Sequence, residues 1–216
     1  MSMHQNYAVF GMGRYGRSVA KELIKNGADV LAVDINESVI KGLVGEFPIC
    51  KCADVTNPDV IEELDIGSMD NVIIAMAGNL EASVMAAMLC KEVGVPRVIV
   101  KCANEMHCRI LSKVGADQVV VPEYESGSRL AKNLLSAGFI DLVDLSEDVS
   151  LLHLDVRSEW VGKNLMELNL RQKYGINVVA FDKEGKVSAE IDPQLPLEQG
   201  MQLIIIADPA KLKKIK

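Results

Sequence analysis

The stretch Tyr7-Ala-Val-Phe-Gly11-Met-Gly13-Arg-Tyr-Gly16 decides the fold of this chain. An apolar strand runs into a GxGxxG turn that opens a helix. Eighteen residues past Gly16, a second apolar strand ends on Asp34. A strand, a glycine turn, a helix and a distal acid in this order are typical of a dinucleotide-binding βαβ unit. The sequence therefore predicts a Rossmann-type parallel sheet.

Each glycine of this turn has its own physical role. Gly11 allows the tight turn, Gly13 lets a diphosphate approach the backbone, and Gly16 lets the helix pack closely on the strand. The free N–H groups and the positive end of the helix dipole then hold phosphate. Asp34 accepts hydrogen bonds from the adenosine ribose, and its charge disfavours the 2′-phosphate of NADP. The motif predicts an adenine nucleotide and leaves ATP, ADP, NAD and NADH open.

Composition narrows the class of protein. The 216 residues fit one large or two small domains, and the 49% hydrophobic content is that of a globular core. The longest apolar runs have the length of strands, and the first residues do not read as a secretion signal. The net charge of −7 argues against nucleic-acid binding. The five cysteines include no CxxC pair, which favours reduced, buried thiols over a zinc site.

Strand and helix signals alternate through the first half of the chain. We expect strands at residues 7–10, 29–33, 48–52, 71–76, 97–101 and 118–121. We expect helices at residues 14–26, 37–46, 57–64, 79–92 and 105–113. Six parallel strands with crossover helices form a complete doubly wound α/β sheet.

The pattern changes past Pro122. A helix is expected at residues 123–138, then strands at 142–145, 150–156, 176–181 and 202–207, a short helix at 165–174 and a hairpin turn at 182–185. The sequence thus predicts a Rossmann-type nucleotide-binding domain (1–124), a crossover helix or linker (125–139) and a small α+β C-terminal domain (140–216). This last domain is poor in acid–base residues, and His153 has a packing or surface role.

Two charged residues beside the glycine turn and the third strand refine the expected ligand. The Arg14 guanidinium suits a terminal phosphate, in its own subunit or across a subunit boundary, although an exposed arginine in a first helical turn is the plain alternative. Asp54 follows the third strand, beside the expected place of adenine. Its carboxylate either accepts from the exocyclic amine or caps the next helix together with Thr56.

Further candidates end the later strands at the same carboxyl edge. Ala75, Met76 and Ala77 leave room for the nucleotide. Lys101 either binds phosphate or pairs with an acid. Glu123 either holds a hard cation beside the phosphates or occupies the first turn of a helix.

These residues occur together in motifs that resemble the RCK (KTN) family. The motifs are Gly-x-Gly-Arg-Tyr-Gly16, Ala-Val-Asp34-Ile35-Asn36, Ala53-Asp-Val55-Thr56, Gly115-Ala-Asp117 and Val121-Pro-Glu123. The resemblance covers essentially the whole chain and is closest to the cytosolic regulatory subunits of Ktr/Trk potassium uptake systems. The phrase Val161-Gly-Lys-Asn-Leu165, followed by Leu168-Asn-Leu-Arg-Gln-Lys-Tyr-Gly175, is the most specific part, because oxidoreductases do not carry it after a Rossmann unit.

The resemblance implies a nucleotide-binding regulatory subunit without catalytic activity. It implies an RCK C-terminal domain and dimers that assemble into an octameric ring. The ring docks on a membrane potassium-translocating channel subunit of the KtrB/TrkH type and gates potassium uptake. The expected location is the cytoplasm, at the inner face of the cell membrane.

The resemblance also implies a set of site residues, which match the family motifs position by position. The nucleotide site comprises Gly11, Met12, Gly13, Arg14, Tyr15, Gly16, Asp34, Ile35, Asn36, Asp54, Val55, Ala75, Met76, Ala77, Lys101 and Glu123. Glu123 helps bind a divalent cation, Mg²⁺ or Ca²⁺, at a subunit interface. Cyclic di-AMP is expected in the C-terminal domain at Arg171, Ile176 and Asn177.

Two other functions compete with this interpretation. An NAD-dependent oxidoreductase needs an acid–base group near the nicotinamide, and only His107 and Lys101 are candidates. A soluble NADH redox sensor would act on a partner other than a channel. The assembly separates this sensor from the channel subunit, because an octameric ring suits a channel and a dimer does not.

Overall fold

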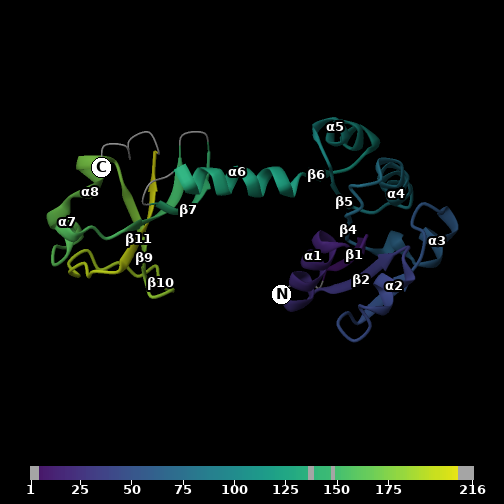
Figure 1. Ribbon diagram of the computed structural model, residues 1–216, viewed down its shortest axis with the longest axis horizontal. Helices are drawn as coiled ribbons and strands as arrows, with labels where there is room; N and C mark the ends of the chain where they lie inside the picture. Colours follow the sequence, from purple (N-terminus) through teal and green to yellow (C-terminus); the bar gives the residue numbers. More distant parts are fainter. Residues whose placement is uncertain (1–4, 136–138, 147–148, 209–216) are drawn as a thin grey trace. The chain divides into compact units, whose positions relative to one another are not determined.

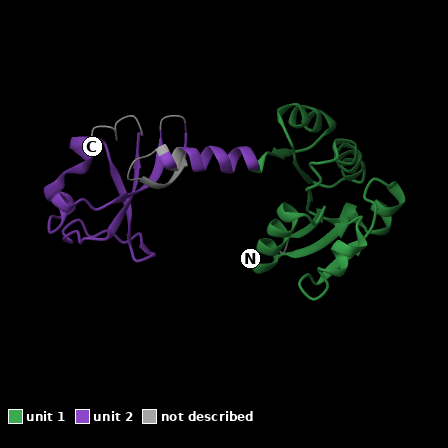
Figure 2. Ribbon diagram, in the orientation of Figure 1, with its two compact units in different colours: residues 1–122 green, residues 123–216 purple. Residues whose placement is uncertain are grey.

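The computed structural model describes residues 5–135, 139–146 and 149–208. The chain divides into two compact units, residues 1–122 and 123–216, which are described separately below (Figure 2). The three-part division of the chain into residues 1–124, 125–139 and 140–216 stays a prediction.

The first unit is built on a six-stranded sheet of parallel strands (Figure 1). Its strands are β1 (Asn6–Phe10), β2 (Asp29–Asp34), β3 (Ile49–Cys52), β4 (Asn71–Ile74), β5 (Arg97–Lys101) and β6 (Gln118–Val120). Their spatial order is β3-β2-β1-β4-β5-β6, so the order reverses between β1 and β4. Open α/β sheets bind ligands at such a reversal, outside the carboxyl ends of the strands. The predicted doubly wound sheet is confirmed.

Helices cover both faces of this sheet because successive strand residues point to opposite sides. The helices are α1 (Arg14–Lys25), α2 (Glu37–Lys41), α3 (Pro58–Glu63), α4 (Leu80–Glu92) and α5 (Glu105–Val114), with a 3₁₀ turn η1 (Ile66–Ser68). On one face, α1 and α2 pack on strand residues such as Val9 and Ala32. On the other face, α3, α4 and α5 pack on residues such as Phe10 and Val98.

Helix α2 is shorter than the sequence predicts. It ends at Lys41, and Gly42 is its C-cap residue. The chain then turns through Gly45, which has a φ of 91°. Two glycines within four residues favour a turn over continued helix, because they lose more backbone entropy in a helix than other residues do. The predicted extension of this helix to residue 46 is therefore wrong.

The second unit contains a five-stranded sheet with antiparallel pairs, in the order β10-β9-β11-β8-β7. Its elements are α6 (Pro122–Leu135), β7 (Phe139–Asp144), β8 (Ser150–Asp155), η2 (Ser158–Trp160), α7 (Leu165–Leu168), α8 (Leu170–Tyr174), β9 (Asn177–Lys183), β10 (Lys186–Ser188) and β11 (Met201–Ala207). The predicted hairpin joins β9 to β10 through Gly185, which has a φ of 80°. The end of the helix predicted at 123–138 lies outside the described residues.

The predicted helix 165–174 is two short helices, because Asn169 interrupts it. Asn169 adopts the left-handed conformation, with φ 48° and ψ 45°, so it ends α7 and begins α8. Its side-chain amide donates to Gln172 Oε1 at 2.9 Å. The turn buries Leu168 and Leu170 in the core of the unit, beside the buried Trp160.

The cysteines are all free thiols. Cys90 and Cys102 are buried, as predicted, whereas Cys52 is exposed and Cys50 and Cys108 are half-buried. Burial raises the pKa of the Cys90 thiol to about 12. No group of three or more potential metal-ligating side chains occurs within residues 5–135, 139–146 and 149–208.

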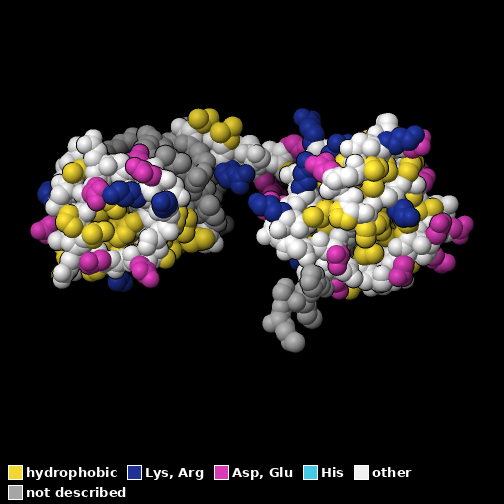
Figure 3. Space-filling view, turned by 90° about the horizontal axis from the view of Figure 1, so that it is seen from below, with side chains coloured by type: hydrophobic (Ala, Val, Ile, Leu, Met, Phe, Trp, Pro, Cys, Tyr) yellow, Lys and Arg dark blue, Asp and Glu magenta, His cyan; other side chains and the backbone are white. Residues whose placement is uncertain are grey.

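Basic and acidic side chains are interspersed on the face shown in Figure 3, with no broad field of positive charge. This distribution agrees with the net charge of −7. None of the helices in the described ranges is long and apolar enough to span a membrane.

Asp117 anchors the amino end of β5. Its Oδ2 accepts from the Val98 N–H at 2.7 Å and lies 3.0 Å from Lys91 Nζ. Desolvation alone would raise the pKa of Asp117, but the hydrogen bonds from Val98 and Lys91, with the Lys91 charge, outweigh it and lower the pKa.

We expect Asp117→Asn to lower the free energy of unfolding at pH 7 by about 1 kcal/mol or less, since the partners are partly exposed. The lowered pKa means that the charge stabilises the fold above the unfolded-state pKa, and this contribution disappears as pH falls through the folded-state pKa. The wild-type and variant stabilities should converge below that pH in urea titrations. A difference that persists unchanged in acid would contradict the electrostatic origin.

Replacement of Asn169 tests the left-handed turn. Asn169→Ala should lower the free energy of unfolding by about 1 kcal/mol, because alanine keeps the Cβ that crowds the carbonyl in this conformation and loses the local hydrogen bond of the Asn169 amide. Asn169→Gly, the matched control, adopts the conformation freely and should stay within about 0.5 kcal/mol of wild type. The fluorescence of Trp160, the single tryptophan, reports unfolding of this unit in urea. Equal losses for the two variants would show that backbone conformation is not the cause.

Candidate functional site

The glycine turn brings the ends of β1 and β4 against the start of α1. Gly11 has a φ of 88°, and its N–H donates to the Val33 carbonyl at 2.8 Å. A Cβ at Gly11 would lie 2.8 Å from Met76 Cγ, and one at Gly16 would overlap the Gly11 carbonyl oxygen. The turn is therefore too tight for a side chain at either position.

Gly13 is different, because open space lies above it. It is the N-cap residue of α1, no side chain caps that helix end, and its first turn carries no acid. A Cβ at Gly13 would meet nothing within 4 Å. Backbone N–H groups at an open, uncapped helix start favour an anion there, assisted by the helix dipole. Arg14 is exposed at the same helix start.

Asp34 is held in place by backbone donors. Its Oδ2 accepts from the Met12 N–H at 2.7 Å, and its Oδ1 accepts from the Asn36 N–H at 2.9 Å. Each oxygen keeps acceptor capacity for a ligand hydroxyl. The Met12 side chain is fully buried, so this residue contributes only its backbone to the site. The half-buried carboxylate is thus fixed beside the glycine turn.

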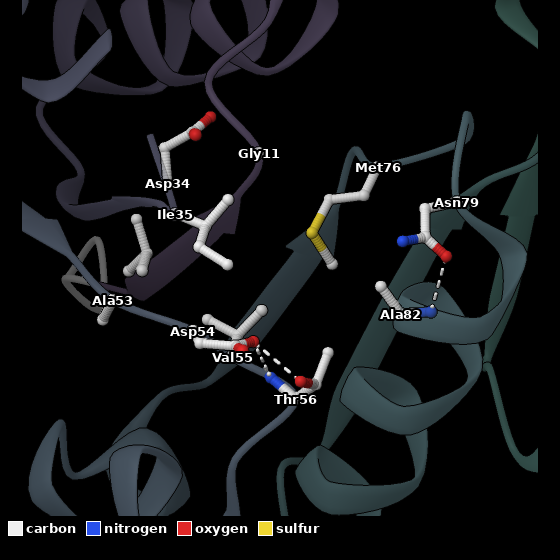
Figure 4. A pocket seen from close by; sticks show the side chains of 11 residues that line it. Gly11, Asp34, Ile35, Ala53, Asp54, Val55, Thr56, Met76, Asn79 and Ala82 are labelled. Atoms are coloured by element: carbon white, nitrogen blue, oxygen red, sulfur yellow. Dashed lines mark hydrogen bonds between the residues drawn. The ribbon is translucent and has the colours of Figure 1, made fainter. Parts of the chain in front are cut away.

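A cavity of about 330 Å³ lies next to Asp34. It is lined by Gly11, Val33, Asp34, Ile35, Ala53, Asp54, Val55, Thr56, Met76, Asn79 and Ala82. Figure 4 shows Ile35, from the loop after β2, and Met76, from the loop after β4, on opposite sides of this cavity. Ile35 is 67% exposed. Two apolar side chains that face each other across a cavity suit a flat aromatic ring.

Asp54 is an exposed residue in the lining of the same cavity. Its Oδ1 accepts from the Thr56 hydroxyl at 2.7 Å and the Thr56 N–H at 3.0 Å (Figure 4), and these bonds lower the Asp54 pKa. The ionised carboxylate can accept a hydrogen bond from an amine. The alternative role as a helix cap is wrong, because the N-cap of α3 is Asn57, which accepts from the Asp59 N–H at 3.0 Å.

Lys101, the last residue of β5, contacts Tyr15 in the first turn of α1. Its ammonium lies 5.4 Å from the centre of the Tyr15 ring, within the range of a cation–π interaction. Ala75 and Ala77 are half-buried at the end of β4, and Asn36, which follows Asp34, is exposed. The structure therefore gathers the predicted residues of the first unit around one sheet edge, although their role in binding stays a prediction.

The remaining predicted residues lie outside this cavity. His107 is half-buried near the start of α5, where its backbone N–H donates to the Asn104 side-chain oxygen. Glu123 is exposed in the first turn of α6, in the second unit. Arg171 and Asn177 are exposed, whereas Ile176 is 1% exposed. A ligand at these three positions would contact the backbone of Ile176 rather than its side chain. The cation and cyclic di-AMP sites stay predictions.

Five lining residues were not among the predicted site residues: Val33, Ala53, Thr56, Asn79 and Ala82. They come from the carboxyl ends of β2 and β3 and from the start of α4. Asn79 caps α4 by accepting from the Ala82 N–H at 3.0 Å. The signal that identifies them is position, since residues directly after parallel strands line the same sheet edge.

Comparisons with known families match almost the whole chain. Residues 7–122 match the TrkA-N domain and residues 152–216 match the TrkA-C domain. The chain is 38% identical to the Ktr system potassium uptake protein C of Bacillus subtilis, over 85% of this chain and 83% of that protein. It is 33% identical to the Ktr system potassium uptake protein A of Vibrio alginolyticus, over 96% of this chain and 94% of that protein.

Solved structures share the fold at lower identity. The GsuK channel superposes with a TM-score of 0.70 at 16% identity, over 99% of this chain and 39% of that one. The GsuK RCK domain superposes with a TM-score of 0.55 at 21% identity, over 99% of this chain and 46% of that one. This chain thus spans less than half the length of these structures, and the likeness shows a common fold.

Two alanine substitutions test the geometry of the turn. Gly16→Ala should lower the free energy of unfolding by about 1–3 kcal/mol, because its methyl group would overlap the Gly11 carbonyl. Gly13→Ala, the matched control at an open position with a φ of −72°, should lower it by less than about 1 kcal/mol, a loss that reflects only the poorer N-cap that alanine makes. Thermal unfolding followed by circular dichroism measures both. A Gly16→Ala variant as stable as Gly13→Ala would disprove the close packing.

Proposed function

Because the chain belongs to the family of Ktr/Trk potassium uptake proteins with a TrkA-N and a TrkA-C domain, we propose that it is a nucleotide-binding regulatory subunit that gates a membrane potassium-translocating partner. One observation carries the nucleotide part of this proposal. The open helix start at Gly13 and the fixed carboxylate of Asp34 flank the same turn, so one ligand can present a diphosphate to the first and ribose hydroxyls to the second.

The cavity completes this binding mode. The adenine ring lies between Ile35 and Met76, where it covers the exposed side chain of Ile35. Its exocyclic amine donates to Asp54, whose carboxylate stays ionised because Thr56 lowers its pKa. The ribose hydroxyls donate to Asp34, and the diphosphate accepts from the N–H groups at the start of α1.

Arg14 favours ATP and ADP over the nicotinamide nucleotides. Its charged side chain is exposed at the helix start where the phosphates would end. An arginine pairs with a terminal phosphate through two hydrogen bonds, which a nicotinamide ring does not offer. Structures of the GsuK channel are described as bound to NAD and to ADP. Both nucleotides therefore belong in the test.

The residues of the cavity favour a role without catalysis. Its two carboxylates already accept hydrogen bonds, Asp34 from Met12 and Asn36, and Asp54 from Thr56. A lowered pKa also makes Asp54 a poor general base near neutral pH. The relatives act in potassium uptake systems. An oxidoreductase would need an acid–base group that the cavity lining does not supply.

Gating requires a ligand that binds one arrangement of the subunits better than another. Exposed apolar side chains at helical spacing, Met85 and Met88 on α4 and Leu130 and Leu134 on α6, support association of several copies. We propose that dimers form an octameric ring on a KtrB/TrkH-type channel subunit, at the cytoplasmic face of the membrane. A divalent cation held by Glu123 and cyclic di-AMP in the C-terminal domain belong to the same proposal.

Calorimetric titration of the nucleotide-stripped protein with ATP, ADP, NADH and NAD tests the ligand. We expect ATP and ADP to bind more tightly than the nicotinamide nucleotides. Arg14→Ala should weaken ATP about tenfold or more and ADP much less, because it removes charge-assisted bonds to the terminal phosphate. Asp34→Ala should weaken all four ligands. Equal losses of ATP and ADP at Arg14 would refute its role, and NADH binding without ATP binding would favour a redox sensor.

Substitution of Glu123 tests the cation. Glu123→Gln keeps the size of the side chain and removes its charge, so the ATP-bound assembly should depend less on Mg²⁺ or Ca²⁺. Light scattering of the ATP-bound protein over a series of cation concentrations measures this dependence. Glu125→Gln, in the same turn of α6, is the matched control. An unchanged cation response in Glu123→Gln would place the cation elsewhere.

A further inference from the structure

A second cavity, of about 480 Å³, lies along β3, the edge strand of the first unit. It shares only Ala53 with the cavity beside Asp34. Its apolar lining comes from β2, β3, α3 and the residue after η1, and consists of Leu31, Ile49, Val60, Leu64 and Met69. This volume is in the range of sites for small molecules.

The short helix α3 borders this cavity. It has six residues, and β3 beside it is partly uncovered. Ile49 is consequently 49% exposed, whereas Leu31 on the neighbouring strand is 8% exposed. Apolar surface of this kind gains free energy when a ligand removes it from water.

Two opposite charges complete the lining. Lys51 contributes an ammonium group from β3, and Glu63 contributes a carboxylate from the end of α3. Neither residue forms an ion pair with another residue in the described ranges of the chain. One cation, one anion and an apolar floor complement a molecule that carries both charges and an apolar group.

We propose that this cavity between β3 and α3 binds a small zwitterion with an apolar side chain, the chemistry of an apolar amino acid such as leucine. The α-carboxylate pairs with Lys51, the α-ammonium group pairs with Glu63, and the side chain covers Ile49 and Leu31. A simple apolar anion would leave Glu63 as a repelling charge, and a simple apolar cation would do the same with Lys51.

The edge strand connects this site with the nucleotide cavity. The Ala53 N–H donates to the Asp34 carbonyl at 3.1 Å, and the Cys52 thiol lies 3.5 Å from the Ile35 carbonyl oxygen. A ligand that orders β3 therefore acts on the backbone of the residues proposed to hold ribose and adenine. Coupling between two sites is reciprocal, so the nucleotide affects the zwitterion equally. This coupling rests on the proposed function, whereas zwitterion binding does not.

Calorimetry of the full chain with L-leucine, N-acetyl-L-leucine and L-leucinamide tests the site. We expect saturable leucine binding, with at least tenfold weaker binding of both blocked analogues, because each lacks one charge. Lys51→Met and Glu63→Gln should each weaken leucine at least tenfold, and Lys113→Met, on α5 outside the cavity, should not. The proposal is overturned by absent leucine binding, by equal binding of N-acetyl-L-leucine, or by wild-type affinity in both variants.

The coupling is measured separately. The dissociation constant of ADP should shift at least twofold in saturating leucine, and this shift should be absent in Lys51→Met. An unchanged ADP constant would overturn the coupling. Binding of leucine to a protein that binds no nucleotide would refute the proposed function and support the zwitterion site.

Discussion

The first unit depends on the contact between the backbone of Gly11 and the α-carbon of Gly16. No side chain fits between the glycine turn and the start of α1, so the helix begins directly above the carboxyl end of β1. Ala75 and Met76, in the loop after β4, pack against the same two glycines. The two glycines thus set how closely β1, α1 and the loop after β4 approach one another. This close approach places the open helix start at Gly13 at the carboxyl end of the sheet.

Asp34 adds a fixed carboxylate beside the glycine turn. The Met12 N–H, which the turn directs toward β2, bonds to Asp34 at 2.7 Å. The carboxylate therefore has one position relative to the helix start. A ligand meets a preformed pair of groups, and little side-chain entropy is lost on binding. The nearby Asp54 is fixed in the same way by Thr56.

Much of this arrangement could be predicted from the sequence, because local patterns encode it. The glycine motif, Asp34 and the strand at residues 97–101 needed only short-range signals, and the structure has β5 at those residues. The early end of α2 and the left-handed Asn169 were missed. A helical pattern of apolar residues continues through both positions, and backbone conformation, rather than hydrophobicity, decides there. The cavity residue Ala82 was missed as a site residue because it lies inside α4, where no local pattern distinguishes it from the rest of the helix.

The position of β1 between β2 and β4 has a consequence for synthesis of the chain. A ribosome delivers β1 first and β2 soon after, but Tyr7 pairs with Asn71, which emerges 64 residues later. Until then the central strand of the sheet has one unpaired edge, and unpaired edges invite pairing with other chains. The antiparallel hairpin of β9 and β10 closes within a few residues. The nascent first unit is therefore the part of the chain with the greater need for protection by chaperones.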